Sequence, residues 1–274
     1  MFVIKKFLSI TVVGIILLLL IPLQPNETFS KIATPITQQI DQLVEGKTNE
    51  TTLKKPKSQN FAIRNIQMNM SRNEVEQKLD QPIKGIQKGR TIYENDNDEY
   101  DIFDKDGIYT TAFYDQHENN QLTGLMQISH QMENRLNSQY AAPSKYLQES
   151  FEKENYYLLN AERVQKGLQP LSYSNKLAGT ARKHSTDMAE NQYFDHTNLK
   201  GESPFDRMEK DGHQYQTAAE NLAYGQTSAI FAHHGLMNSS GHRKNILNEN
   251  VKTIGIGVDF NEKRQPYWTE NYIG

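Results

Sequence analysis

The longest apolar stretch of the chain lies at its N-terminus, where Lys5 and Lys6 precede the run Phe7–Leu23. At roughly 17 residues this run is as short as a membrane-spanning helix can be, but longer than a usual signal-peptide core of about 7–15 residues. No A-x-A cleavage site follows it. We therefore predict that residues 1–27 are a membrane anchor with the lysines in the cytoplasm, and a cleaved signal peptide is the alternative. Either one places the rest of the chain outside the cell.

The first strong helix signal lies further on, at Ser71 and Glu74, which have the spacing of a capping box. Val75 and Leu79 are four residues apart and give this helix one apolar face. Pro82 lies just beyond its expected end. The pattern predicts one short amphipathic helix.

Short runs of β-branched and aromatic residues follow, separated by polar turns, as in a meander of strands. The predicted strands are Thr91–Tyr93, Tyr100–Phe103, Ile108–Tyr114 and Leu122–Ile128. Asp104–Gly107 is a tight-turn signal between two of them. A helix against such a meander predicts a small α+β domain at residues 61–145, with the polar residues 28–60 as a linker. The acidic turn Asn95–Asp98 lacks the glycine and the spaced glutamate of a calcium loop, so we interpret it as solvated.

From Tyr156 onward the apolar positions recur at helical spacing. One helix is predicted from Tyr156 to Gly167, with Pro170 beyond its end. A second amphipathic helix carries Leu177 and Met188 on one face. The remaining predicted elements are helices at about Phe205–Lys210 and Ser228–Asn238, and strands at Thr253–Phe260 and Gln265–Tyr272.

Composition narrows the classes of function. The formal net charge of −3 is too balanced for a nucleic-acid-binding surface, so we expect no nucleic-acid partner. Cysteine is absent, which excludes disulfides, thiolate metal sites, cysteine nucleophiles and a cysteine-linked lipid anchor. An exported protein of this composition depends on packing alone for its stability.

Seven motifs occur in order: N-x-x-R at 160–163, A-R-K-H-S-T-D-M at 181–188, Y-F-D-H at 193–196, G-E-S-P-F-D-R-M at 201–208, A-E-N-L-A at 219–223, N-S-S-G-H-R at 238–243 and W-T-E-N-Y at 268–272. This series resembles the bacterial branch of the CAP superfamily, also called the SCP-like extracellular domain. The resemblance implies an α-β-α sandwich at residues 150–274. The stretch at 70–82 is similar, over few residues, to the CAP-associated domain that precedes bacterial CAP domains. We therefore expect an α+β protein of two domains.

The resemblance also implies a polar cavity that holds two histidines and one or two glutamates. The F-x-H motif puts the first histidine at His196, the E-N motif puts the glutamate at Glu220, and the G-H motif puts the second histidine at His242. Eukaryotic relatives have a second glutamate three residues after a tryptophan. Leu236 and Ser239 stand at those two positions, so the second acid is missing here.

Two imidazoles and one carboxylate in a cleft suit two kinds of chemistry. His196 and His242 could bind a divalent ion such as Zn²⁺. Alternatively, Glu220 could orient a histidine that acts as general base toward a serine or water nucleophile. Ser185 and Ser240 are available, but nothing in the sequence places either beside an imidazole. Neither a G-x-S-x-G elbow nor an H-E-x-x-H helix occurs.

The other candidate residues receive structural interpretations. His184 lies within an amphipathic helix and is expected to be a hydrogen-bonded structural residue. His233 and His234 point about 100° apart, so they cannot share one site, and we place them on a helix surface. Trp268 and Tyr272 alternate with polar residues on the last strand and are expected in the core.

Three functions stay open at this point, and so does the question of whether the protein is an enzyme. The first is a binding module that holds a lipid, glycan or peptide of the cell envelope, with or without a metal. The second is a metal- or histidine-dependent hydrolase that acts on envelope peptide or ester bonds. The third is a scaffold in which the cavity residues only stiffen the fold. We favour the first, in an extracellular or cell-surface protein that is membrane-anchored or secreted.

Overall fold

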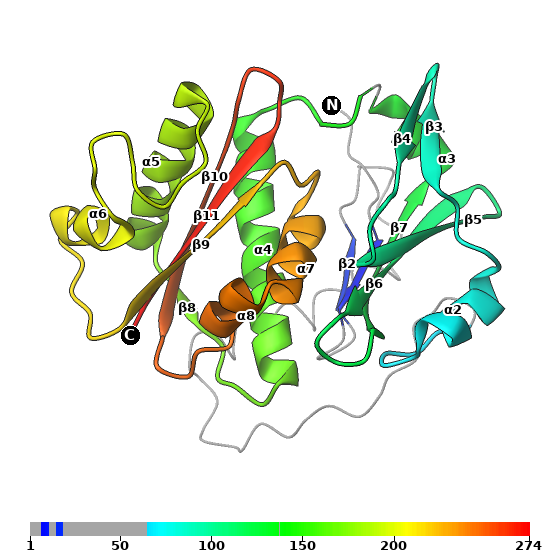
Figure 1. Cartoon of the computed structure of the whole chain (residues 1–274), viewed down its shortest axis with the longest axis horizontal. Coiled ribbons are helices and arrows are strands. Elements are labelled where there is room, and N and C mark those ends of the chain that lie inside the picture. The colour runs from blue at the N-terminus through cyan, green and yellow to red at the C-terminus, as the bar shows by residue number, and fades with distance from the viewer. Residues whose placement is uncertain (1–6, 11–14, 19–64, 137) are drawn as a thin grey trace, which may run out of the picture. The chain divides into compact units, whose positions relative to one another are not determined.

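The computed structural model describes residues 7–10, 15–18, 65–136 and 138–274. Its backbone contacts divide these residues into two units, which meet in the sequence between Gln139 and Tyr140 (Figure 1). Each unit has its own sheet and its own helices.

The first unit is built on an antiparallel five-stranded sheet in the order β2-β1-β7-β6-β5. Its elements are β1 (Phe7–Ile10), β2 (Ile15–Leu18), α2 (Arg72–Leu79), β3 (Gly85–Lys88), β4 (Thr91–Glu94), β5 (Tyr100–Lys105), β6 (Ile108–Asp115), β7 (Gln121–Ser129) and α3 (His130–Arg135). β3 and β4 pair only with each other. The predicted small α+β fold is therefore present. Three elements that the sequence did not predict extend it: β3, α3, and β1, which pairs with β7.

Local signals account for the best-predicted parts of this unit. Ser71 and Glu74 make both hydrogen bonds of the capping box that begins α2, and Val75 and Leu79 are buried in the core. The hairpin between β5 and β6 turns at Asp106 and Gly107, whose φ angles are 54° and 77°. Two successive positive φ angles define the tight turn that Asp-Gly favours, which confirms the predicted turn.

The N-terminal apolar run does not form the predicted helix where the structure describes it. Phe7–Ile10 and Ile15–Leu18 are strands that pair with each other, and the first of them pairs with β7. Both segments contain isoleucine, whose branched side chain favours extended backbone. The rest of this run and the predicted linker lie outside the described residues. Within the described part of the chain, no helix has the length and apolar character needed to cross a bilayer.

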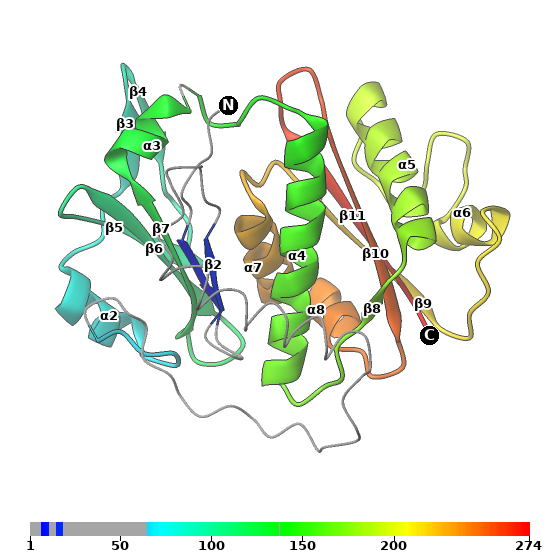
Figure 2. The same ribbon diagram turned by 180° about the vertical axis from the view of Figure 1, so that it is seen from behind.

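The second unit is a three-layer α-β-α sandwich, as the resemblance implied. Its sheet has the order β8-β10-β11-β9, and α5 covers one face while α4 and α7 cover the other (Figure 1 and Figure 2). Its elements are α4 (Lys145–Gln165), β8 (Ser172–Tyr173), α5 (Asn175–Asn191), α6 (Pro204–Lys210), β9 (Ala218–Tyr224), α7 (Ala229–Asn238), α8 (Ser240–Ile246), β10 (Thr253–Phe260) and β11 (Pro266–Ile273).

Two glycines of β10 allow α5 to lie directly on the sheet. A Cβ added to Gly255 would lie 2.2 Å from the backbone nitrogen of Ala178, and one added to Gly257 would lie 2.1 Å from that of Arg182. These distances leave no room for any side chain other than hydrogen. The close approach fixes the depth of α5 and therefore the position of its histidine, His184.

Three features of this unit differ from the sequence-based expectations. α4 begins at Lys145, capped by Ser144, rather than at Tyr156, because its first turns pack Phe151 against Trp268 with ring centroids 5.1 Å apart. Ala218–Tyr224 forms β9, an edge strand that pairs antiparallel with β11. α8 follows α7 with only a break at Ser239.

Candidate functional site

The three residues expected in the cavity come from three separate elements. His196 lies in the loop between α5 and α6, Glu220 in β9 and His242 in α8. His196 Nδ1 lies 2.9 Å from Glu220 Oε1. His242 Nδ1 instead lies 2.8 Å from Ser239 Oγ, at the position where eukaryotic relatives have their second glutamate. The structure therefore joins His196 to Glu220 directly, and His242 to a serine.

Arg207 completes this arrangement, and sequence reasoning missed it. Its Nη2 donates to Glu220 Oε2 at 2.7 Å, and its Nη1 donates to the carbonyls of His196 and Glu202 at 2.7 and 3.0 Å. Both oxygens of the buried Glu220 carboxylate are thus engaged, one by His196 and one by Arg207. One signal in the sequence pointed to Arg207: it lies in the motif at 201–208, three residues after Pro204, at which α6 begins.

Amide side chains fix the positions of Glu220 and α8 relative to each other. Asn221 donates to the carbonyl of His242 at 3.2 Å, and Asn245 donates to the carbonyl of Glu220 at 3.3 Å and to Asn221 Oδ1 at 2.9 Å. Asn221 also donates to Glu270, a fully buried carboxylate on β11. These bonds join β9, β11 and α8, so the positions of Glu220 and His242 depend on each other.

The two cavity imidazoles have pKa values shifted in opposite directions. The hydrogen bond to Glu220 raises the pKa of His196, against the opposing effect of partial burial. Burial lowers the pKa of His242, and the nearby His196 lowers it further. As the pH falls, His196 therefore gains a proton before His242 does.

The donor atoms fit a metal ion poorly. Nδ1 of each imidazole already has a partner, and both Glu220 oxygens are occupied. A metal would find one free nitrogen on each of His196 and His242, whereas structural zinc takes four ligands and catalytic zinc takes three from the protein. Within the described residues, no group of three or more His, Asp or Glu side chains is arranged to hold a metal ion.

The serines proposed as nucleophiles lie elsewhere. Ser185 is fully buried, donates to the carbonyl of Gly257 at 2.9 Å and lies 2.8 Å from the hydroxyl of Thr269. Ser240 is exposed at the start of α8. The serine that does contact an imidazole is Ser239.

Of the remaining histidines, two lie where the sequence did not place them. His233 and His234 are 2% and 4% exposed, so the interpretation as helix-surface residues is wrong. α7 is apolar on nearly all sides and packs on both α4 and β9, which leaves no solvent-facing side for them. His184 is buried with Nε2 3.0 Å from the carbonyl oxygen of Asp195. Trp268 and Tyr272 are fully buried in the core, as predicted.

Exposed aromatic side chains border the His196 loop. Phe194 is 48% exposed, and its ring centroid lies 5.8 Å from that of Tyr224 at the end of β9. Tyr224 in turn packs on Tyr267 with a centroid distance of 4.4 Å. The polar His196–Glu220 pair is therefore close in sequence and space to an apolar surface.

Comparisons with known proteins agree with this fold. Residues 156–272 match the sequence profile of CAP, the cysteine-rich secretory protein family, and residues 46–139 match that of the CAP-associated N-terminal domain. Over 140 residues the chain is 41% identical to the uncharacterized protein YkwD of Bacillus subtilis, and over 129 residues it is 40% identical to the uncharacterized membrane protein YlbC of the same organism. These matches span 51% and 47% of this chain, but only 52% and 36% of the two relatives.

Among solved structures, an extracellular protein with an SCP domain from Bacillus anthracis superposes with a TM-score of 0.64 at 24% identity, covering 75% of this chain and 72% of that one. A cysteine-rich secretory protein from Staphylococcus aureus superposes with a TM-score of 0.50 at 18% identity, covering 84% and 70%. At these identities the likeness concerns the fold alone. The chain therefore carries an extracellular-type domain of the CAP superfamily at residues 156–272, preceded by a CAP-associated N-terminal domain at residues 46–139.

Proposed function

We propose that this protein is an exported cell-envelope protein whose cleft at His196, Glu220 and His242 binds an envelope ligand directly. The observation that carries the proposal is the contrast in exposure within one hydrogen-bonded pair. The His196 side chain is 51% exposed, whereas that of its partner Glu220 is 2% exposed. A buried carboxylate thus holds a solvent-facing imidazole in one orientation.

This contrast favours binding over a purely structural role. A polar network that only stiffens a fold gains most when all its members are buried and mutually satisfied. Here the hydrogen bond to Glu220 occupies Nδ1, and Nε2 of His196 has no hydrogen-bond partner among the described residues. The half-exposed ring is therefore available to a ligand.

The surroundings of His196 indicate the kind of group that would bind. The raised pKa of His196 gives it a larger protonated fraction in mildly acidic surroundings, so Nε2–H suits a hydrogen-bond acceptor on the ligand. The exposed ring of Phe194 offers an apolar contact nearby. A lipid, glycan or peptide that combines a polar acceptor with an apolar part would satisfy both.

Membrane attachment through residues 1–27 belongs to the same proposal, and it requires Phe7–Ile10 and Ile15–Leu18 to leave the strands β1 and β2. It is supported by the apolar composition of Phe7–Leu23 and by the 40% identity to a relative named as a membrane protein. The test is fractionation of producing cells, with the full chain compared to a variant in which Ile10, Val13 and Leu17 are changed to aspartate. Anchoring predicts that the wild type stays with membranes after a carbonate wash; wild type found only in the medium would contradict it.

Substituting both cavity histidines tests the binding proposal. We expect the His196→Ala/His242→Ala variant of the full chain to lose at least tenfold in retention on isolated cell envelopes, with its unfolding midpoint nearly unchanged. His130→Ala, whose imidazole pairs with Asp104 in the other unit, is the matched control. Retention equal to wild type, or a loss explained by unfolding of the variant, would support the scaffold function instead.

A hydrolase is the second candidate, and the contact between Ser239 and His242 is the observation that favours it. The lowered pKa of His242 keeps the imidazole neutral near pH 7, so it could accept the serine proton. However, no carboxylate hydrogen-bonds to His242 within the described residues. We expect a fluorophosphonate probe to leave Ser239 unlabelled. Labelling that His242→Ala abolishes would favour the hydrolase.

A further inference from the structure

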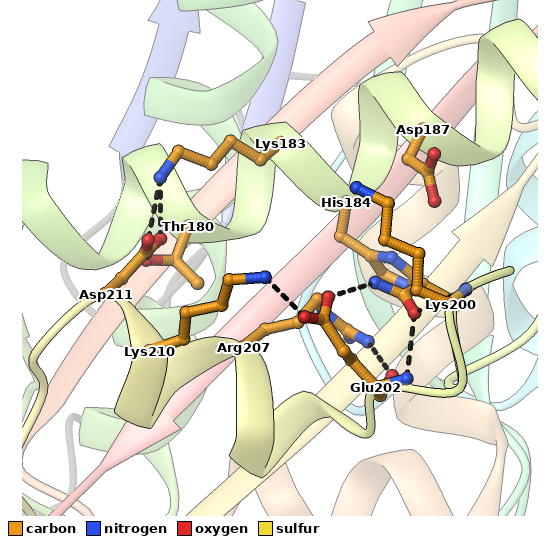
Figure 3. A pocket seen from close by; sticks show the side chains of 10 residues that line it. Thr180, Lys183, His184, Asp187, Lys200, Glu202, Arg207, Lys210 and Asp211 are labelled. Carbon is orange, nitrogen blue, oxygen red and sulfur yellow. Dashed lines mark hydrogen bonds and ion pairs between the residues drawn. The ribbon is translucent and has the colours of Figure 1, made fainter.

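A cavity of about 250 Å³ lies beside the His196–Glu220 pair but does not include either residue. Figure 3 shows side chains converging on it from α5, from α6 and from the loop between them. The lining residues that matter here are Lys183 and His184 on α5, Arg207 and Lys210 on α6, and Lys200 and Glu202 in the loop. The motifs at 181–188 and 201–208 thus meet at a site that the proposed function does not use.

The lining is polar, and its charges nearly cancel. Lys183 pairs with Asp211 at 2.8 Å, and Lys210 pairs with Glu202. The charge of Arg207 is compensated by Glu220, which does not line the cavity. No lining residue has an all-hydrocarbon side chain, and the aromatic ring in the lining is that of His184. Such a surface offers many donors and acceptors but no net charge for a strongly ionic ligand.

His184 contributes a buried acceptor to this cavity. The side chain is 1% exposed, and its Nε2 lies 3.0 Å from the carbonyl oxygen of Asp195. A carbonyl oxygen can only accept, so Nε2 carries the proton. Burial lowers the pKa of His184, which keeps the ring neutral and leaves Nδ1 as an acceptor. This nitrogen has no hydrogen-bond partner among the described residues.

Arg207, which lines the same cavity, contributes a buried donor. Its terminal nitrogens bind the carbonyls of His196 and Glu202 and the carboxylate of Glu220, but its Nε–H has no hydrogen-bond partner among the described residues. A buried polar atom without a partner is destabilising, so the binding of a ligand that satisfies both atoms is favoured.

We propose that this cavity binds a neutral, hydroxyl-rich ligand of the size of a monosaccharide, whose hydroxyls donate to His184 Nδ1 and accept from Arg207 Nε–H. A hydroxyl is both a donor and an acceptor, so it matches this pair. The volume equals that of about eight water molecules at about 30 Å³ each, which suits a single sugar ring. The two atoms are buried, so the ligand reaches them after a local rearrangement of the cavity wall. The inference does not depend on the proposed function of the His196 cleft.

The test is a titration of the full chain, labelled with ¹⁵N-histidine, that follows the ring nitrogens of His184 and His196 separately by NMR. The probes are N-acetylglucosamine, glycerol and, as the charged probe, glycerol 3-phosphate. We expect N-acetylglucosamine to shift the His184 Nδ1 resonance saturably in the direction of hydrogen-bond acceptance, and glycerol 3-phosphate to shift it much less.

Each other outcome overturns the inference. An equal or larger shift with glycerol 3-phosphate would make the cavity an anion site. A response of His196 alone would locate the sugar in the cleft of the proposed function. No shift of His184 with any probe would leave an ordered water as the partner of these atoms.

Two variants separate binding from stability. His184→Gln keeps a donor for the carbonyl of Asp195 and an acceptor for the ligand, whereas His184→Leu keeps neither. We expect calorimetry to show weakened sugar binding in the first and none in the second. Equal binding by wild type and His184→Leu would exclude the proposed contact.

Discussion

At the residue scale, Glu220 shows how one buried charge can organise a site. Its carboxylate is removed from water, and two partners of different character compensate for this: the fixed guanidinium of Arg207 and the titratable ring of His196. Arg207 also binds the carbonyl of His196. The same residue therefore holds the His196 loop in place and compensates the Glu220 charge.

Removing Arg207 is expected to act on both stability and titration. Arg207→Met would leave Glu220 with only His196 as a partner, which should cost about 3–5 kcal/mol of unfolding free energy. The pKa of His196 should rise, since the Arg207 charge now lowers it. Urea unfolding and an NMR titration of His196 measure the two effects. Lys210→Met, which removes an exposed partner of Glu202, should leave both quantities close to wild type; an unchanged His196 titration in Arg207→Met would contradict the assigned role.

The donor set of the cleft gives a second expectation at this scale. With Nδ1 of both imidazoles engaged, Zn²⁺ should not bind near one equivalent in calorimetric titration of the wild type. The control is the His196→Ala/His242→Ala variant, which should give the same trace. One-equivalent binding that the double variant loses would restore the metal site that the sequence suggested.

At the scale of elements, the contact between α5 and β10 positions much of the polar chemistry. α5 carries His184, which holds the carbonyl of Asp195 next to His196, and it also lines the 250 Å³ cavity. Its distance from the sheet depends on Gly255 and Gly257, because their missing side chains let the two backbones touch.

Gly257→Ala should therefore destabilise the second unit strongly. The added Cβ would meet backbone atoms of Ala181 and Arg182, which cannot yield as a flexible side chain would. We expect a loss of more than about 3 kcal/mol of unfolding free energy, with a shift of the His184 resonances. Gly179→Ala, on α5 itself, meets nothing within 4 Å and should stabilise by about 0.5–1 kcal/mol. Similar stability for the two variants would show that the close packing is not needed.

At the scale of the whole molecule, buried histidines couple folding of the second unit to pH. Burial lowers the pKa of His233 to about 3 and that of His234 well below its usual value. The unfolded chain takes up protons at both residues below pH 6.5, while the folded chain does not. Their contribution to stability is therefore complete above that pH and is lost as the pH falls.

Between pH 7 and pH 5 these two residues should together cost about 4 kcal/mol of unfolding free energy. Glu270 opposes the trend at lower pH, because burial raises its pKa and the folded state takes up its proton first. Trp268 is the chain's single tryptophan and is fully buried in this unit, so its fluorescence in urea follows the transition. His233→Leu/His234→Leu should flatten the pH dependence. An equally steep dependence in that variant would assign it to other groups.

Particular residues show which features of the fold and the site could be predicted from the sequence. The Ser71–Glu74 box, the Asp106–Gly107 turn and the strands that became β10 and β11 were predictable because each depends on neighbours within a few positions. His196, Glu220 and His242 were found through motifs, not through periodicity. Arg207 and Ser239 were missed as site residues because their roles depend on contacts with distant elements.

The sequence by itself therefore determined the helix caps, the turns, the apolar faces and the motif series that identifies the CAP domain, because these are set by local backbone preference and side-chain order. Only the tertiary structure decided which polar atoms meet: His196 with Glu220, His242 with Ser239, and Arg207 with Glu220. The same holds for the strand β9, whose residues become extended by pairing with β11, and for the burial of His233 and His234 on a helix with no free face. These outcomes follow from packing between segments far apart in the chain, where the energy of each contact depends on what lies opposite.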